Sequence, residues 1–161
     1  MAQALRNAEK IESIKKDFDT AGFNTLVVPA DSTDPKSVAN AFSTIRDKLG
    51  KPEVLVYNAG SFQYNSILDI TPESFEQNWK ANCMGGFLTA KEVLADMSAN
   101  NKGTILFTGA TASLRGGANF ANLAVGKFGL RALAQSIARE FGPKGVHVSH
   151  VIIDGQIDNE R

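Results

Sequence analysis

Three polar features lie among apolar residues of this chain, where side chains of their types can do chemistry. Lys127 follows Leu123 by four residues on a predicted apolar helix; an ammonium there can extend its charge to solvent. Asn82 lies mid-helix, where asparagine has low propensity, so it either kinks the helix through a local bond or faces a cleft. Asn58-Ala59-Gly60 follows the apolar run 54–57 and is either a turn or a support for neighbouring strands and a ligand.

Composition excludes several classes of protein. The 161 residues contain 17 Lys+Arg and 17 Asp+Glu, so no net charge draws the chain to nucleic acid or anionic membranes. Cys83 is the single cysteine, and His147 and His150 face opposite sides of a predicted strand, so we expect neither a disulfide framework nor a metal site. The apolar runs fall short of the roughly 18 residues of a membrane span, and no secretory signal is visible. We expect a cytoplasmic protein.

The elements that must position these residues alternate between helices and short apolar runs. Asp34 and Pro35 are typical of an N-cap and a first helical residue. The apolar pattern predicts helices over 7–20, 35–49, 71–100 and 119–141, and strands over 25–29, 54–57, 104–107 and 146–153. The run 54–57 does not alternate, which predicts a strand buried on both faces. Such alternation is typical of a parallel sheet with helices on both sides.

The tripeptide 58–60, Asn82, the run 103–113 and Lys127 occur in an order and spacing that resemble the core of the short-chain dehydrogenase/reductase (SDR) family. The resemblance runs from Arg6 to about Asp158. It implies a single domain over 1–161, an α/β Rossmann-like doubly wound parallel sheet that is truncated at both ends.

The resemblance also implies roles for these residues. Asn58, Ala59 and Gly60 would support the adenosine side of the cofactor and the central sheet. Asn82 would hold a water that connects to the active-site lysine, and Lys127 would bind the nicotinamide ribose. Gly155 and Ile157 match positions that flank the nicotinamide.

Two further positions bear on the cofactor. Arg6 resembles the residue that receives the 2′-phosphate of NADP, and Leu5 stands where NAD-preferring members carry an acid, so NADP is expected over NAD. Alternatively, Arg6 is a solvated arginine at a helix start. Asp31 and Ser32 resemble the pair that contacts the adenine ring; alternatively, they form the turn and cap signal before Asp34.

The family's proton-handling groups are replaced in this chain. Members carry a Tyr four residues before the Lys and a Ser thirteen residues before that Tyr, and Leu123 and Ala110 stand at these places. Strand alternation predicts that the Thr111 hydroxyl points away from the side that residue 110 faces. Tyr64, in the loop after Gly60, is a candidate substitute acid.

The phosphate-binding part of the fold is also missing from the sequence. A dinucleotide fold begins with a strand and a glycine-rich turn whose amides bind the pyrophosphate, and before Gly50 this chain has only Gly22. The resemblance therefore implies that the family's first strand, turn and helix, roughly 30 residues, are absent from this sequence. Alternatively, the working protein contains residues that this sequence omits. That strand is central in the family's sheet, so the strand over 25–29 would lack a neighbour linking it to 54–57.

Two hypotheses of function remain open. The first is an NADP-linked oxidoreductase that acts on a carbonyl or alcohol. The second is a catalytically silent binding or assembly protein. Family members pair through the two long helices that match 71–100 and 119–141, which implies a homodimer or homotetramer, with Phe120 and Leu133 as candidate contacts.

Overall fold

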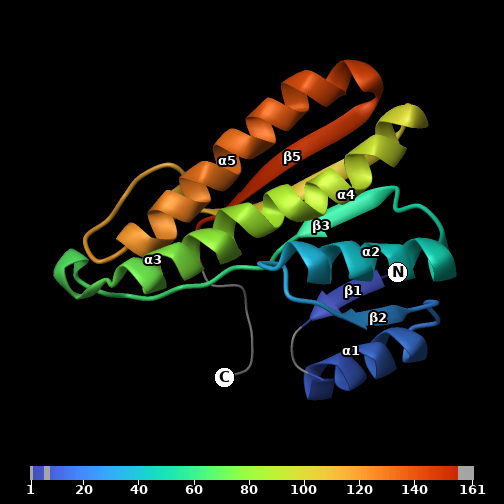
Figure 1. Cartoon of the computed structure of the whole chain (residues 1–161), viewed down its shortest axis with the longest axis horizontal. Helices are drawn as coiled ribbons and strands as arrows, with labels where there is room; N and C mark the ends of the chain where they lie inside the picture. The colour runs from blue at the N-terminus through green and yellow to red at the C-terminus, as the bar shows by residue number, and fades with distance from the viewer. Residues whose placement is uncertain (1, 6–7, 156–161) are drawn as a thin grey trace.

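The computed structural model describes residues 2–5 and 8–155, and they form the expected α/β Rossmann-like arrangement (Figure 1). The strands are β1 (Ala2–Leu5), β2 (Leu26–Pro29), β3 (Val54–Tyr57), β4 (Gly103–Ala110) and β5 (Val146–Ile153). The helices are α1 (Ala8–Thr20), α2 (Pro35–Leu49), α3 (Pro72–Trp79), α4 (Gly85–Ala99) and α5 (Ala121–Phe141). The predicted N-cap of α2 is confirmed, because the Asp34 carboxylate accepts hydrogen bonds from the backbone of Lys36 and Ser37.

The strands form two separate parallel sheets. One sheet contains β1 and β2, and the other has the order β3-β4-β5. Figure 1 shows β1 and β2 between α1 and α2, β3 between α2 and α4, and β5 between α4 and α5. Among the described residues no strand links β2 to β3, as predicted for the strand over 25–29.

The prediction that β3 is buried on both faces is wrong. Val54 and Val56 are 59% and 58% exposed, although Tyr57 is buried. The reason is that these valines face open space rather than a packed element: a cavity of about 470 Å³ lies between β3 and α2, with Phe42 and Ile45 on its opposite wall.

The main core lies where α4 and α5 cover the three-stranded sheet. Ile105 and Phe107 of the middle strand β4 are fully buried, and Val93 of α4 and Leu130 of α5 pack in the same cluster. A smaller cluster joins β2 to α2. The described chain thus has two hydrophobic units, and the larger one contains the three-stranded sheet with α4 and α5.

The predicted helix over 71–100 is interrupted by a π-helical turn at Lys80–Met84. A π-turn inserts a residue into the α-helical ladder and changes which side chains share a face afterwards. Trp79 before the π-turn and Phe87 after it are 38% and 46% exposed, although both belong to the apolar pattern that predicts this helix. The buried positions of α4 include Gly86, whose missing side chain admits Leu130.

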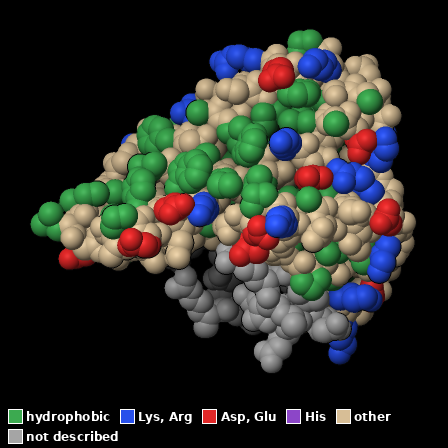
Figure 2. All heavy atoms as spheres, in the orientation of Figure 1, with side chains coloured by type: hydrophobic (Ala, Val, Ile, Leu, Met, Phe, Trp, Pro, Cys, Tyr) green, Lys and Arg blue, Asp and Glu red, His purple; other side chains and the backbone are tan. Residues whose placement is uncertain are grey.

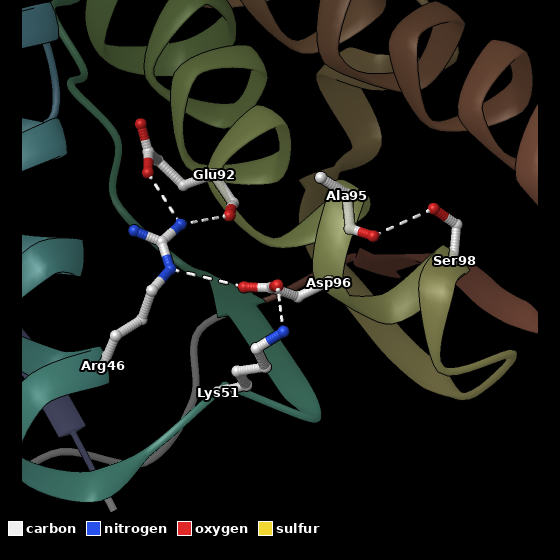
Figure 3. Close-up of polar contacts among 6 residues, drawn as sticks. All are labelled: Arg46, Lys51, Glu92, Ala95, Asp96 and Ser98. Carbon is white, nitrogen blue, oxygen red and sulfur yellow. Dashed lines mark hydrogen bonds and ion pairs between the residues drawn. The ribbon is translucent and has the colours of Figure 1, made fainter.

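A charged cluster links the two units by joining α2 to α4 (Figure 3). The Arg46 guanidinium lies 2.9 Å from Glu92 Oε2 and 3.3 Å from Asp96 Oδ2, and Lys51 Nζ lies 2.7 Å from Asp96 Oδ1. The hydrogen bond from Lys51 is the main cause that lowers the pKa of Asp96. In the same picture, Ser98 donates to the Ala95 carbonyl near the end of α4.

Candidate functional site

Lys127 lies at the carboxyl ends of two neighbouring strands. Its side chain is only 8% exposed, and Nζ donates a 2.8 Å hydrogen bond to the carbonyl of Thr108 on β4. A Cβ placed on Gly60, just after β3, would lie 3.7 Å from the same nitrogen. Burial lowers the pKa of Lys127. The ammonium is therefore held beside the crevice where parallel α/β sheets bind ligands.

Asn82 connects the loop after Gly60 to the π-turn through hydrogen bonds. Its Nδ2 donates to the carbonyls of Ser61 (2.8 Å) and Asn78 (3.0 Å), and the Ser61 N–H donates to Oδ1 at 3.3 Å. Asn82 is fully buried, and a Cβ on Gly126 of α5 would come within 2.5 Å of its Cβ. The bond to Asn78 agrees with the interpretation of a local bond within the helix, and the bonds to Ser61 order the loop next to Lys127. The role of Asn82 in holding a water that connects to the lysine stays a prediction.

Ala110 and Leu123 lie together on one cavity of about 390 Å³. Its lining residues are Ala110, Thr111, Ala112, Arg115, Gly116, Gly117, Phe120, Leu123, Ile153 and Gly155. The prediction that the Thr111 hydroxyl points away from this side rested on strand alternation, and it stays a prediction. Strand β4 ends at Ala110 and a 3-10 turn follows, so alternation no longer applies, and the Thr111 hydroxyl contacts the Asp154 carboxylate.

The other nearby hydroxyls are already engaged. Ser113 is fully buried; its Oγ accepts the Ala110 N–H at 3.1 Å and lies 3.5 Å from Nε2 of His150. Burial, then Arg131 and Lys127, lower the pKa of His150. Ser113 therefore stabilises the turn at Ala110 through this hydrogen bond, and it is not among the residues that line the cavity.

Tyr64 lies at the rim of this cavity. Its hydroxyl accepts a 3.0 Å hydrogen bond from Nδ2 of Asn119, and its ring centroid lies 5.3 Å from that of Phe120, which lines the cavity. The side chain is 61% exposed. Its role as a substitute acid stays a prediction.

A model of the short chain dehydrogenase family matches residues 1–158. The chain belongs to this family. MabA, a 3-oxoacyl-[acyl-carrier-protein] reductase of Mycobacterium tuberculosis, is 35% identical over 83% of this chain and 53% of its own length. FabG of Salmonella typhimurium, with the same enzyme name, is 28% identical over 99% of this chain and 65% of its own length. The chain thus spans about half to two thirds of the length of these relatives.

Solved structures agree on the fold. A crystal structure of a short-chain dehydrogenase from Rhodopseudomonas palustris matches with a TM-score of 0.88 at 38% identity, covering 94% of this chain and 71% of that one. A gluconate 5-dehydrogenase from Burkholderia cenocepacia, solved with NADP and tartrate, matches with a TM-score of 0.89 at 22% identity, covering 95% and 60%. Because these matches cover nearly the whole chain, both of its sheets take part in the shared fold.

The predicted cofactor residues of this SDR chain lie in different surroundings. Ser32, Ala59 and Gly60 line the cavity of about 470 Å³ beside β3. The segments that follow β2 and β3 therefore face the same cavity. Asp31 Oδ1 accepts bonds from the N–H (2.9 Å) and hydroxyl (2.8 Å) of Thr33, as in the turn interpretation. Its contact with adenine stays a prediction.

Three other predicted residues are placed as follows. Asn58 is exposed directly after β3. Gly155 lines the cavity that contains Ala110. Arg6 and Ile157 lie outside the described residues.

Sequence reasoning missed a cluster of amides behind Leu123. Oε1 of Gln63 accepts hydrogen bonds from Nδ2 of Asn78 (3.2 Å) and Asn122 (3.4 Å). The Oδ1 atoms of both asparagines are buried without a hydrogen-bond partner among the described residues. The available signal was an asparagine directly before residue 123. Arg115 of the cavity was also missed, although an Arg-Gly-Gly loop beside residue 110 could have indicated it.

Proposed function

We propose that this chain carries the nicotinamide-side residues of an NADP-linked oxidoreductase that transfers hydride to or from a carbonyl or alcohol carbon. The observation that supports it most is the position of the buried Lys127 ammonium between Gly60 and Thr108. Asn82 orders the loop at the same place. Removing a charge from water is costly, and a buried ammonium with a lowered pKa beside a ligand crevice is typical of a functional site.

The residues present fit one part of the cofactor. Lys127 would donate hydrogen bonds to the ribose hydroxyls. The exposed segment Asn58-Ala59-Gly60 would contact the adenosine side, because a glycine lets the ligand approach the backbone closely. When bound, the nicotinamide supplies or accepts the hydride. Within these 161 residues no glycine-rich turn precedes Gly50, so we assign no residues to the pyrophosphate. The preference for NADP over NAD rests on Arg6 and Leu5.

Proton transfer is the weak step in this proposal. Neither Ala110 nor Leu123 can donate a proton, and general acid–base catalysis is typically worth 10²–10⁴-fold. We therefore expect slow turnover, or a substrate that needs little help from an acid.

Substrate-dependent NADPH oxidation tests the proposal. A panel of ketones and aldehydes is assayed with the parent, with Lys127→Met, and with Lys48→Met as the control, since Lys48 is an exposed lysine of α2. We expect oxidation above the no-protein rate in the parent and control only. Activity that persists in Lys127→Met would contradict the proposed role.

A silent binding or assembly role is the second candidate, and the lack of a proton donor at residues 110 and 123 favours it. Reproducible substrate-dependent NADPH oxidation, at any rate above background, excludes this alternative.

We also propose that two copies pair through the long helices. Figure 2 shows hydrophobic side chains gathered over α3, α4 and α5, and Phe87, Leu94 and Leu133 line a groove between α4 and α5. Phe120, the other candidate contact, lies at the Ala110 cavity instead. Phe87→Glu should lower the dimer fraction in sedimentation, whereas Leu68→Glu, at a 90% exposed position outside these helices, should not. Equal effects of both changes would exclude a specific helix interface.

Among the described residues, no helix has the length and apolar character needed to cross a bilayer. A cytoplasmic location stays our prediction.

A further inference from the structure

One charged side chain, Arg115, lines the cavity that contains Ala110 and Leu123. It lies in the loop between β4 and α5, and its backbone N–H donates to the Thr111 carbonyl at 3.2 Å, which fixes the start of that loop. The Asp154 carboxylate contacts the Thr111 hydroxyl. Within the described ranges, no carboxylate forms an ion pair with Arg115. Among the described residues, the exposed Arg115 thus has no carboxylate partner at the edge of this cavity.

The remaining walls are mainly apolar. Leu123 and Ile153 line the cavity together with Phe120. The Phe120 ring centroid lies 5.5 Å from that of Phe62 and 5.3 Å from that of Tyr64, so aromatic rings border the cavity on one side. A ligand that satisfies this lining has an apolar carbon skeleton and one anionic group.

We propose that this cavity binds a small oxo- or hydroxy-carboxylate, with Arg115 as the partner of the carboxylate. A planar guanidinium binds carboxylates through two parallel hydrogen bonds. Arg115 also suits a phosphate, but among the described residues no second cation lines the cavity to balance a dianion. A volume of about 390 Å³ lies near the small end of ligand sites. The proposal rests on the proposed function for the redox step, but its binding step can be measured separately.

Binding of a matched pair of compounds tests this assignment. 4-Methyl-2-oxopentanoate and its methyl ester share a skeleton and a ketone but differ in charge. By titration calorimetry on the whole protein, we expect the acid to bind roughly 10- to 100-fold more tightly than the ester, the range for a charge-assisted pair. Added salt should reduce the difference.

Variants locate the effect. Arg115→Gln should remove the preference for the acid, and Arg115→Lys should leave a smaller one, because an ammonium lacks the two-pronged geometry. Arg139→Gln on the exposed side of α5 is the control and should keep the full preference. Equal thermal melts of parent and variants show that the changes are local. If a variant does not fold, the comparison of acid and ester on the parent still decides.

The outcomes separate this inference from the proposed function. If the ester binds as tightly as the acid, or Arg115→Gln keeps the preference, the inference fails even if ketones are reduced. If the acid binds through Arg115 but NADPH is not oxidised, the inference holds and the redox proposal fails. Inorganic phosphate that displaces the acid at equal concentration would overturn the assignment to a carboxylate.

Discussion

Residues 110 and 123 face one cavity, and restoring their hydroxyl groups tests what the cavity is arranged to do. Residue 123 lies one helical turn before Lys127, so a Tyr there would lie beside an ammonium that lowers the pKa of a phenol. A Ser at 110 would add a hydrogen-bond donor for a carbonyl oxygen. We expect Ala110→Ser with Leu123→Tyr to raise carbonyl reduction by about 10²-fold or more, measured as NADPH oxidation.

The matched control replaces the tyrosine by a ring without a hydroxyl. Ala110→Ser with Leu123→Phe fills the same space and should show no gain. If the Ser–Tyr pair is as slow as the Ser–Phe pair, while affinity for NADPH is unchanged, the cavity is not arranged for hydride transfer. The silent binding hypothesis would then be preferred.

His150 makes stability depend on pH. Its folded pKa is lowered by burial, Arg131 and Lys127, so below its ordinary value near 6.5 the unfolded chain binds more protons than the folded one. Stability from neutral His150 is thus fully present above pH 6.5 and is lost as pH falls through the folded pKa. The other polar neighbour that contacts the ring is Ser113.

Denaturant unfolding of parent, His150→Asn and His147→Asn between pH 7.5 and 5 checks this expectation. We expect the parent and the exposed-site control His147→Asn to lose stability together on acidification, and His150→Asn to lose less. Parallel pH curves for all three proteins would show that His150 does not cause the dependence.

Helix periodicity predicts that Leu123 and Lys127 lie on one face. The expectation that Ala110 lies near them came from the family resemblance. Arg115 and the orientation of Thr111 could not be predicted from the sequence. They belong to the turn and loop after β4, whose conformation depends on tertiary bonds such as that of the Thr111 hydroxyl to Asp154. Periodicity carries no information about such bonds.

At the scale of elements, the π-turn and α5 approach each other so closely that Gly126 has no room for a side chain. A Cβ there would lie 2.5 Å from Cβ of Asn82, whereas a Cβ on Gly142 meets nothing within 4 Å. We expect Gly126→Ala to destabilise the protein by about 1–3 kcal/mol through overpacking. Gly142→Ala should be neutral or slightly stabilising, because alanine restricts the unfolded chain.

Unfolding in urea measures both changes. A smaller loss of stability in Gly126→Ala than in Gly142→Ala would show that α5 can move away from the π-turn. NADPH binding should also weaken in Gly126→Ala, since Asn82 orders the loop next to Lys127.

The π-turn itself could not be predicted from the apolar pattern. The apolar pattern over 71–100 fits one continuous helix. A π-turn changes only the backbone hydrogen bonding of one turn, so composition and mean hydropathy do not indicate it. The buried bonds of Asn82 to Ser61 stabilise the wider turn, and they depend on where the loop after β3 passes. The alternation of elements, in contrast, was enough to predict the parallel α/β class.

At the scale of the whole molecule, two sheets are joined through packing of α2 and its charged cluster. The ion pairs of Arg46 are partly exposed, at 21–31% of their side chains, so each contributes only about 0–1 kcal/mol. The larger consequence is the open side of β3. In the described sheet, the backbone of β3 pairs with β4 alone. Val54 and Val56 of this strand are exposed.

An open strand edge with exposed valines invites pairing with other chains, so we expect the 161-residue chain to associate at high concentration. Val56→Lys should reduce this association, because a charge at an edge opposes strand pairing. Its cost in stability should stay within about 0.5 kcal/mol, as is usual for a surface change, since Val56 is 58% exposed.

Light scattering across a concentration series measures the association of the parent and of Val56→Lys. The control Leu68→Lys removes an even more exposed apolar side chain outside the sheets. If it suppresses association as strongly as Val56→Lys, general apolar contact causes the association and the edge of β3 does not.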